Sequence, residues 1–88
     1  MEPFELLLHQ EVIDELRKTR GENRKQLNSF FSVLPTNPYL QSDGSYEDRK
    51  GRIVEQFRVR SYLVEYVVDD PMKEIKVLEL RKLTSDLL

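Results

Sequence analysis

Residues 52–80 read RIVEQFRVRSYLVEYVVDDPMKEIKVLEL and decide the fold, because three strand patterns follow one another within them. In residues 52–60 apolar and polar positions alternate, as in a half-buried strand, with Ile53, Phe57 and Val59 on one side and Gln56, Arg58 and Arg60 on the other. In residues 62–69 both alternating sets are largely apolar, which predicts a strand in the middle of a sheet. Residues 74–80 give the third strand.

The connections between these strands are short. Asp69, Asp70 and Pro71 favour a tight turn, because proline has the fixed φ that the second position of a type I turn requires. A parallel pairing would need a crossover of a dozen or more residues, so the three strands form an antiparallel meander.

The rest of the chain is expected to pack on this meander. Residues 4–8 predict an additional strand near a sheet edge, and residues 10–19 a helix that Gly21 ends. A second helix runs from residue 22 or 23 to Leu34, before Pro35. Residues 37–51 predict a loop. The fold class is therefore α+β in two layers, a helical hairpin on a four-stranded, mainly antiparallel sheet, with a core that includes Leu27, Phe30, Phe31, Phe57, Val64 and Tyr66.

Composition limits the class of protein. Eighty-eight residues are enough for one domain, residues 1–88, and the 39% of hydrophobic residues include no run near the roughly 18 that a membrane span needs. The first ten residues, MEPFELLLHQ, contain no basic segment and only a short apolar run, so we expect neither a signal peptide nor an anchor. The absence of cysteine excludes disulfides and thiolate metal sites and agrees with a cytoplasmic, soluble protein.

The charges are distributed unevenly along the chain, although the formal net charge is only −2. Two segments are basic, residues 17–25 and residues 49–60, and each contains five cations and one anion. Arginines on the outer face of a strand can bind phosphates and stabilise the charge that develops during phosphodiester cleavage. A solvated sheet face, or a surface that binds an acidic partner, is the alternative interpretation of the same pattern.

Other kinds of site find little support in the sequence. His9 is the only histidine and has no cysteine beside it, so it predicts a structural or exposed histidine rather than a metal ligand. No glycine-rich phosphate loop is present, and we expect no cofactor and no metal.

The order of strand, helical hairpin, loop and meander resembles the RelE/ParE superfamily of toxins from bacterial type II toxin–antitoxin systems. The resemblance covers nearly the whole chain, and its most specific positions are Gly51-Arg52, Arg60-Ser61-Tyr62, Glu65-Tyr66, Val68-Asp69 and Lys73-Glu74-Ile75. It implies a toxin whose partner is a cognate antitoxin.

For the RelE-type members, which are ribosome-dependent mRNA interferases and inhibit translation, the resemblance implies a set of basic site residues. The basic residues that carry over by position are Arg49, Lys50, Arg52, Arg58 and Arg60. For an RNase of this kind we expect Arg58 and Arg60 to be catalytic, with Lys50 or Lys82 assisting proton transfer, and Arg49, Arg52 and Arg81 to bind RNA. Those relatives carry an arginine directly after the turn tyrosine, where this chain has Leu63, and they are more basic. The C-terminal segment offers Arg81 and Lys82 but neither the histidine nor the tyrosine that some of them use. These departures fit ParE-like members, which act on DNA gyrase, so the second expectation is a ParE-like toxin or inactive relative that only binds a protein, either gyrase or the antitoxin.

Association with a partner is expected on physical grounds as well. Exposed strand edges favour pairing with an antitoxin or formation of a homodimer. The C-terminal segment adds three leucines that would otherwise be exposed: Leu83, Leu87 and Leu88.

Overall fold

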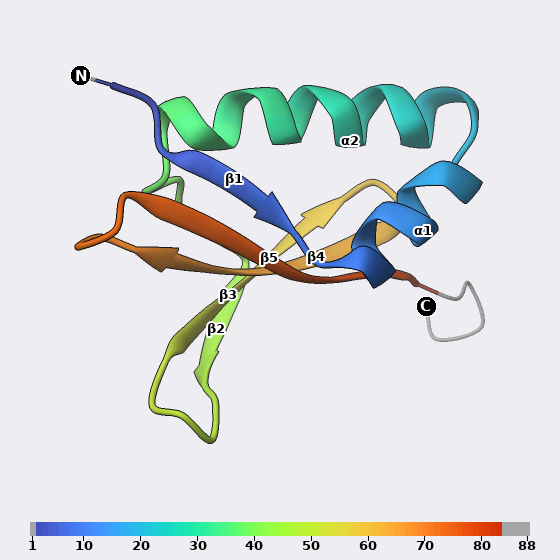
Figure 1. Ribbon diagram of the computed structural model, residues 1–88. Coiled ribbons are helices and arrows are strands. Elements are labelled where there is room, and N and C mark those ends of the chain that lie inside the picture. Colours follow the sequence, from blue (N-terminus) through green and yellow to red (C-terminus); the bar gives the residue numbers. More distant parts are fainter. Residues whose placement is uncertain (1, 84–88) are drawn as a thin grey trace.

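The computed structural model describes residues 2–83, so Leu87 and Leu88 lie outside the described residues. Five strands form one sheet in the order β1-β5-β4-β3-β2, and two helices lie on one of its faces (Figure 1). The elements are β1 (Glu5–Leu8), α1 (Gln10–Lys18), α2 (Gly21–Val33), the short 3-10 helix η1 (Leu34–Thr36), β2 (Gly44–Glu47), β3 (Ile53–Val59), β4 (Tyr62–Asp69) and β5 (Glu74–Lys82).

The predicted meander is confirmed. Both β3 with β4 and β4 with β5 pair antiparallel, and β4, apolar on both faces, is the middle strand of the five. The strand expected near an edge is β1, which pairs parallel to β5 at the end of the sheet. Because the connection from β1 to β5 includes both helices, it is long enough for a parallel pairing.

The expectation of a four-stranded sheet and of a loop throughout residues 37–51 was wrong, because β2 lies within that segment. Its sequence, GSYE, is short and largely polar, so it carries no apolar alternation by which a strand is recognised. Hydrogen bonds to the neighbouring strand hold it instead: residues Gly44 to Glu47 pair antiparallel with β3, and the backbone N–H of Asp43 donates to the carbonyl of Gln56 at 2.9 Å.

Two local predictions also needed correction. Arg60 was placed on a strand, but β3 ends at Val59 and Arg60 lies in the turn to β4 with φ 52°, a left-handed conformation that a non-glycine residue seldom adopts. Gly21 was expected to end the first helix, but the chain leaves α1 at Thr19 and Gly21 is the first residue of α2, with φ 59°. The hydroxyl of Thr19 donates to the carbonyl of Leu16 at 2.6 Å, which helps to satisfy the end of α1.

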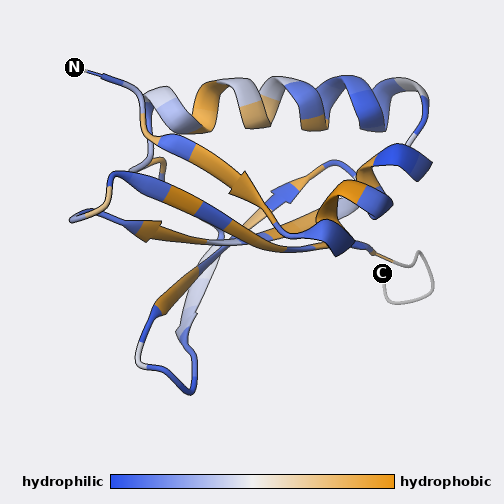
Figure 2. Cartoon of the chain, viewed as in Figure 1, coloured by the Kyte–Doolittle hydropathy of each residue, from blue (hydrophilic) through white to orange (hydrophobic). Residues whose placement is uncertain are grey.

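The core lies between the helices and the sheet and confirms the two-layer α+β architecture. Leu27, Phe30 and Phe31 of α2 are buried, and Figure 2 shows apolar bands on the side of α2 that faces the strands. Val64 and Tyr66 of β4 are completely buried, as predicted. Phe57 is only partly buried, but its ring centroid lies 4.6 Å from that of Phe30.

A β-bulge in β5 keeps this core continuous. Glu65 is opposite Glu79 whereas Tyr66 is opposite Val77, so Leu78 is the additional residue. Without the bulge, the strict alternation of a strand would place Val77 and Leu80 on opposite faces, and both are buried in the core. The bulge therefore lets β5 direct both residues toward the helices.

The opposite face of the sheet, here called the open face, carries no helix among the described residues. Cross-strand partners share a face, so the pairing assigns to it Arg58 and Gln56 of β3, Leu63, Glu65 and Val67 of β4, and Arg81, Glu79 and Lys76 of β5. Leu83 follows β5, and its backbone N–H donates a hydrogen bond to the carbonyl of Ser61 at 2.7 Å. Within residues 2–83, no helix is long and apolar enough to cross a membrane.

Candidate functional site

The seven cations singled out in the sequence fall into two groups in the structure. One group lies in and beside the connection from β2 to β3: Arg49, Lys50 and Arg52. The other lies where β3 meets β4 and where β5 ends: Arg58, Arg60, Arg81 and Lys82. The seven residues of β3 separate the groups by about 20 Å at about 3.3 Å per residue. Lys50 and Arg58 are therefore too far apart to act on one phosphate within a single chain.

The second group contains a row of three residues across the open face, here called the arginine row. Arg58 is opposite Leu63, and Leu63 is opposite Arg81, so the three side chains share one face on three neighbouring strands. Two interstrand spacings of about 4.8 Å place the backbones of Arg58 and Arg81 about 10 Å apart. Both arginines are exposed, and the half-buried Leu63 lies between them. The row can bind an anion from two sides.

Arg58 is held in place by its neighbours. Its backbone N–H donates to Oδ2 of Asp43 at 2.6 Å, and its side-chain Nε donates to the carbonyl of Arg60 at 3.1 Å. Its two terminal guanidinium nitrogens donate no hydrogen bond within residues 2–83. Within the described part of the chain these nitrogens are unpaired, and a guanidinium in this state can bind a carboxylate or phosphate in a bidentate manner.

The other cations of this group are placed differently. Nη1 of Arg81 lies 3.5 Å from Oε1 of Glu79, an exposed ion pair of the kind that contributes little stability and is readily exchanged for another anion. Lys82 is opposite Tyr62, so by strand alternation it is directed away from the face that carries Arg81. Arg60 lies in the turn rather than on the strand. Of the four residues predicted to be catalytic, only Arg58 lies in the arginine row, and the arginine it shares the row with, Arg81, was predicted to bind RNA.

An acidic row lies beside the arginine row, and it was not identified from the sequence. Gln56 is opposite Glu65, and Glu65 is opposite Glu79. Glu65 is only 7% exposed, and its carboxylate accepts hydrogen bonds from the hydroxyl of Tyr46 at 2.9 Å and from Nε2 of Gln56 at 2.7 Å. The hydrogen bond to Glu65 raises the pKa of Tyr46 above its usual value. The signal available in the sequence was one acid within an otherwise apolar strand face.

The first group of cations is organised by Asp48. Its carboxylate accepts the backbone N–H groups of Lys50 and Arg52, both at 2.9 Å, and Nε of Arg52 at 2.8 Å. Hydrogen bonding from the Arg52 backbone is the main reason that the pKa of Asp48 lies below its usual value. Arg52 is therefore already paired, whereas Arg49 and Lys50 are exposed on the turn.

His9 is exposed and precedes α1, so the structure places it outside both groups. Among residues 2–83 no three His, Cys, Asp or Glu side chains are grouped in a way that would hold a metal ion.

Comparisons with known proteins identify the fold. No protein-family model matches the chain, and no curated protein matches it. Solved structures do match. A chain of the archaeal RelE-RelB complex from Pyrococcus horikoshii OT3 is similar with a TM-score of 0.78 and 20% identity, covering 91% of this chain and 94% of that one.

Two further structures agree with this match. The toxin-antitoxin complex RelBE2 from Mycobacterium tuberculosis gives a TM-score of 0.73 at 18% identity, covering 93% of both chains. The isolated E. coli RelE toxin gives 0.71 at 19% identity, covering 92% of this chain and 85% of that one. The chain has a RelE-like fold, which confirms the fold that the sequence resemblance implied; identities this low do not extend the likeness to activity.

Proposed function

We propose that this chain is the toxin of a type II toxin–antitoxin pair and that it inhibits translation in the cytoplasm by cleaving messenger RNA on the ribosome. The RelE-like fold supports the first part, because the similar structures are named as RelE toxins and as complexes of a toxin with its antitoxin. The arginine row supports the second part. The arginine row is the single observation on which the proposed mRNA cleavage depends.

The chemistry expected of the arginine row is phosphate binding. The backbone of Arg58 is held by Asp43 and its terminal nitrogens have no partner among residues 2–83, and Arg81 can leave its exposed pair with Glu79 when a phosphate approaches. Together they would hold the scissile phosphodiester and neutralise the negative charge that builds on it. Arg60, in the adjoining β3–β4 turn, would assist, whereas Lys82 is directed to the other face, so the proton transfer expected of it from the sequence is not assigned to it here. Arg49 and Lys50, exposed on the turn some 20 Å along β3, would contact RNA away from the reacting bond, whereas Arg52 is already paired with Asp48.

A second candidate function is inhibition by protein binding alone, with DNA gyrase as the target. Two observations favour it: Leu63 occupies the centre of the arginine row, and the buried Glu65 lies in the neighbouring row. A carboxylate at this position repels an approaching phosphate. The arginine row is essential if the chain cleaves messenger RNA and dispensable if it only binds a protein, so mutation of the row distinguishes the two candidate functions.

The deciding experiment uses a reconstituted translation system with a defined messenger RNA and maps its 5′ ends by primer extension. We expect ribosome-dependent cleavage by the wild-type chain and a loss of about 100-fold to 1,000-fold for Arg58→Ala and for Arg81→Ala, the usual cost of removing a group that stabilises a developing charge. Arg24→Ala, an exposed arginine on α2, is the matched control and should retain full activity. The proposal would be wrong if the wild-type chain arrested growth without cleaving messenger RNA and if Arg58→Ala and Arg81→Ala arrested growth equally well. Inhibition by protein binding would then take its place, and an assay of DNA supercoiling by gyrase would test it.

A further inference from the structure

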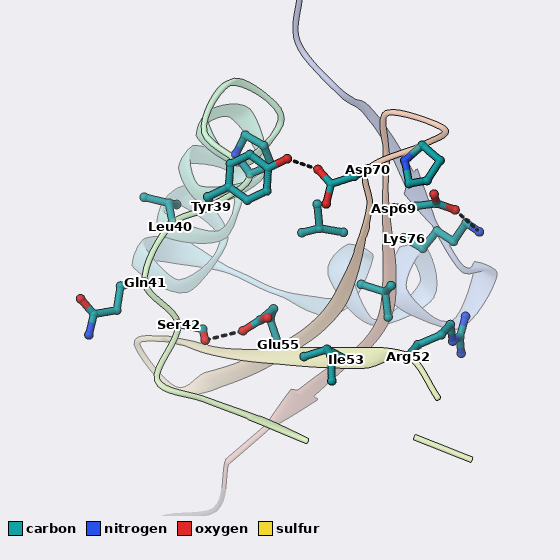
Figure 3. A pocket seen from close by; sticks show the side chains of 14 residues that line it. Tyr39, Leu40, Gln41, Ser42, Arg52, Ile53, Glu55, Asp69, Asp70 and Lys76 are labelled. Atoms are coloured by element: carbon teal, nitrogen blue, oxygen red, sulfur yellow. Dashed lines mark hydrogen bonds and ion pairs between the residues drawn. The ribbon is translucent and has the colours of Figure 1, made fainter. Parts of the chain in front are cut away.

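The pairing of β3 with β4 stops before either strand ends. Its last pair is Glu55 with Tyr66, although β3 begins at Ile53 and β4 continues to Asp69. From that point the β2–β3 hairpin turns away from the sheet (Figure 1). The space between the two strands and the chain after η1 is a cavity of about 760 Å³, here called the wedge (Figure 3).

The wedge has an apolar floor, formed by Leu40, Ile53, Val67 and Val68. Ile53 is 51% exposed. The exposed ring of Tyr39 flanks the same opening. Covering these side chains would remove apolar surface from water, at about 25 cal/mol per Å².

Both strands that border the wedge present an unpaired edge to it. Residues 67–69 pair with β5 only, and residues 53–54 pair with β2 only. Unpaired N–H and C=O groups at such an edge accept an added strand, and the alternate side chains of that strand then enter adjoining pockets. The wedge is therefore suited to an extended peptide segment.

The charges at the rim of the wedge select the kind of segment. Lys76 is paired with Asp69 at 3.3 Å, and Arg52 with Asp48 at 2.8 Å, so both cations are already neutralised. Among residues 2–83, the side chains that bind two further carboxylates are neutral hydroxyl groups: Glu55 accepts from Ser42 at 2.6 Å, and Asp70 accepts from Tyr39 (Figure 3). This leaves a negative rim, which repels nucleic acid and attracts a lysine or arginine.

We propose that the wedge anchors an extended segment of the antitoxin, with an aliphatic side chain over Ile53 and Val68 and a lysine or arginine directed to Glu55 and Asp70. This inference rests on the proposed function, in which the antitoxin is the direct protein partner, while the anionic RNA is excluded by the rim. The wedge lies at the opposite end of β4 from the arginine row. The antitoxin segment in the wedge thus provides affinity without itself covering the phosphate-binding residues.

The test uses this chain and the protein encoded by the adjacent gene, with affinity measured by calorimetry. Ile53→Asp introduces a charge at an already exposed position, and we expect it to weaken binding at least tenfold. Asp70→Lys, which reverses a rim charge, should weaken it by a similar factor. Met72→Asp is the matched control. Met72 is a 64% exposed apolar residue in the adjoining β4–β5 turn and does not line the wedge, so the affinity of this variant for the antitoxin should be unchanged.

Hydrogen exchange of the wild-type complex gives a second readout that needs no mutation. We expect the backbone amides of residues 67–69 to exchange more slowly when the antitoxin is bound. The wedge is not the anchor if the wild-type complex is tight but exchange at residues 67–69 is unchanged, or if Ile53→Asp binds the antitoxin with full affinity. Either result would leave the proposed function intact. Failure of the wild-type chain to bind the adjacent gene's protein at all would overturn both.

Discussion

The hydroxyl of Tyr46 on β2 donates a 2.9 Å hydrogen bond to Oε1 of Glu65 on β4, and so connects the edge strand to the central strand across β3. This bond explains how a four-residue polar strand is retained in the sheet. It also supplies a hydrogen-bond partner for the side chain of Glu65, a residue that is only 7% exposed, and a buried polar group is costly unless it is hydrogen-bonded.

Tyr46→Phe should therefore destabilise the chain by about 1 kcal/mol, because it removes one of the two hydrogen bonds to the buried Glu65. Tyr39→Phe is the matched control. It removes a hydroxyl that donates to Asp70, a carboxylate exposed to water, and should cost less than half as much. Urea unfolding measures both, and equal losses in the two variants would show that Glu65 is not the reason.

The second prediction concerns the aromatic contacts of α2. Phe30→Ala or Phe31→Ala should lower the free energy of unfolding by roughly 3 to 5 kcal/mol, because each ring is 8% exposed and Phe30 also packs on Phe57. Val33→Ala on the same helix is the control, since Val33 is 47% exposed and should cost well under 1 kcal/mol. A loss below about 1 kcal/mol in both phenylalanine variants would mean that α2 does not form the core described here.

The third prediction concerns Tyr66, whose hydroxyl is completely buried and has no hydrogen-bond partner within residues 2–83. Because an unpaired buried hydroxyl costs free energy, Tyr66→Phe should leave stability at neutral pH unchanged or raise it by about 1 kcal/mol. A clear destabilisation in urea would indicate that the hydroxyl has a partner after all.

The same residue determines the behaviour of the fold at alkaline pH. Burial raises the pKa of Tyr66 from 10.0 to about 12, since the charged phenolate is poorly solvated there. A folded-state pKa above the unfolded one means that the loss of stability begins as pH passes 10 and is complete only above 12. Between these values the wild-type chain should lose more stability than Tyr66→Phe, as measured by thermal unfolding at stepped pH. Parallel curves for the two proteins would contradict the raised pKa.

The sequence predicted most of the architecture, because the strands of the meander and the stripe of α2 carry strong apolar periods. β2 was missed for the opposite reason: its four residues are held by hydrogen bonds to β3, which leave no trace in a hydropathy pattern. Arg60 was misplaced because it continues the alternation of β3, whereas the reversal of the chain requires a left-handed residue at that position.

The candidate site was harder to predict, because proximity in sequence is not proximity in space. Lys50 and Arg58 belong to one basic segment but lie at opposite ends of a strand. Arg58 and Arg81 are separated by 22 intervening residues, yet the strand register places them in one row. Only the register, including the bulge at Leu78, identifies such a row, and a one-residue change would turn Arg81 to the other face.

The last prediction follows from the position of Leu63 between the two arginines. Leu63→Arg should place a third guanidinium in the arginine row, because Leu63 is opposite both Arg58 and Arg81. Leu63 is only half-buried at the end of the open face, so the substitution can direct its charge to solvent while the stem packs on the sheet. Under the mRNA-cleavage proposal we expect cleavage on ribosomes to rise by about tenfold or more, because a further donor aimed at the phosphate strengthens the stabilisation of the developing charge.

Leu63→Gln, which changes the shape without adding a charge, is the control and should not show the rise. If Leu63→Arg folds with normal stability and cleaves no better than Leu63→Gln, the arginine row is not where the phosphate binds, and inhibition through protein binding becomes the better account of this surface.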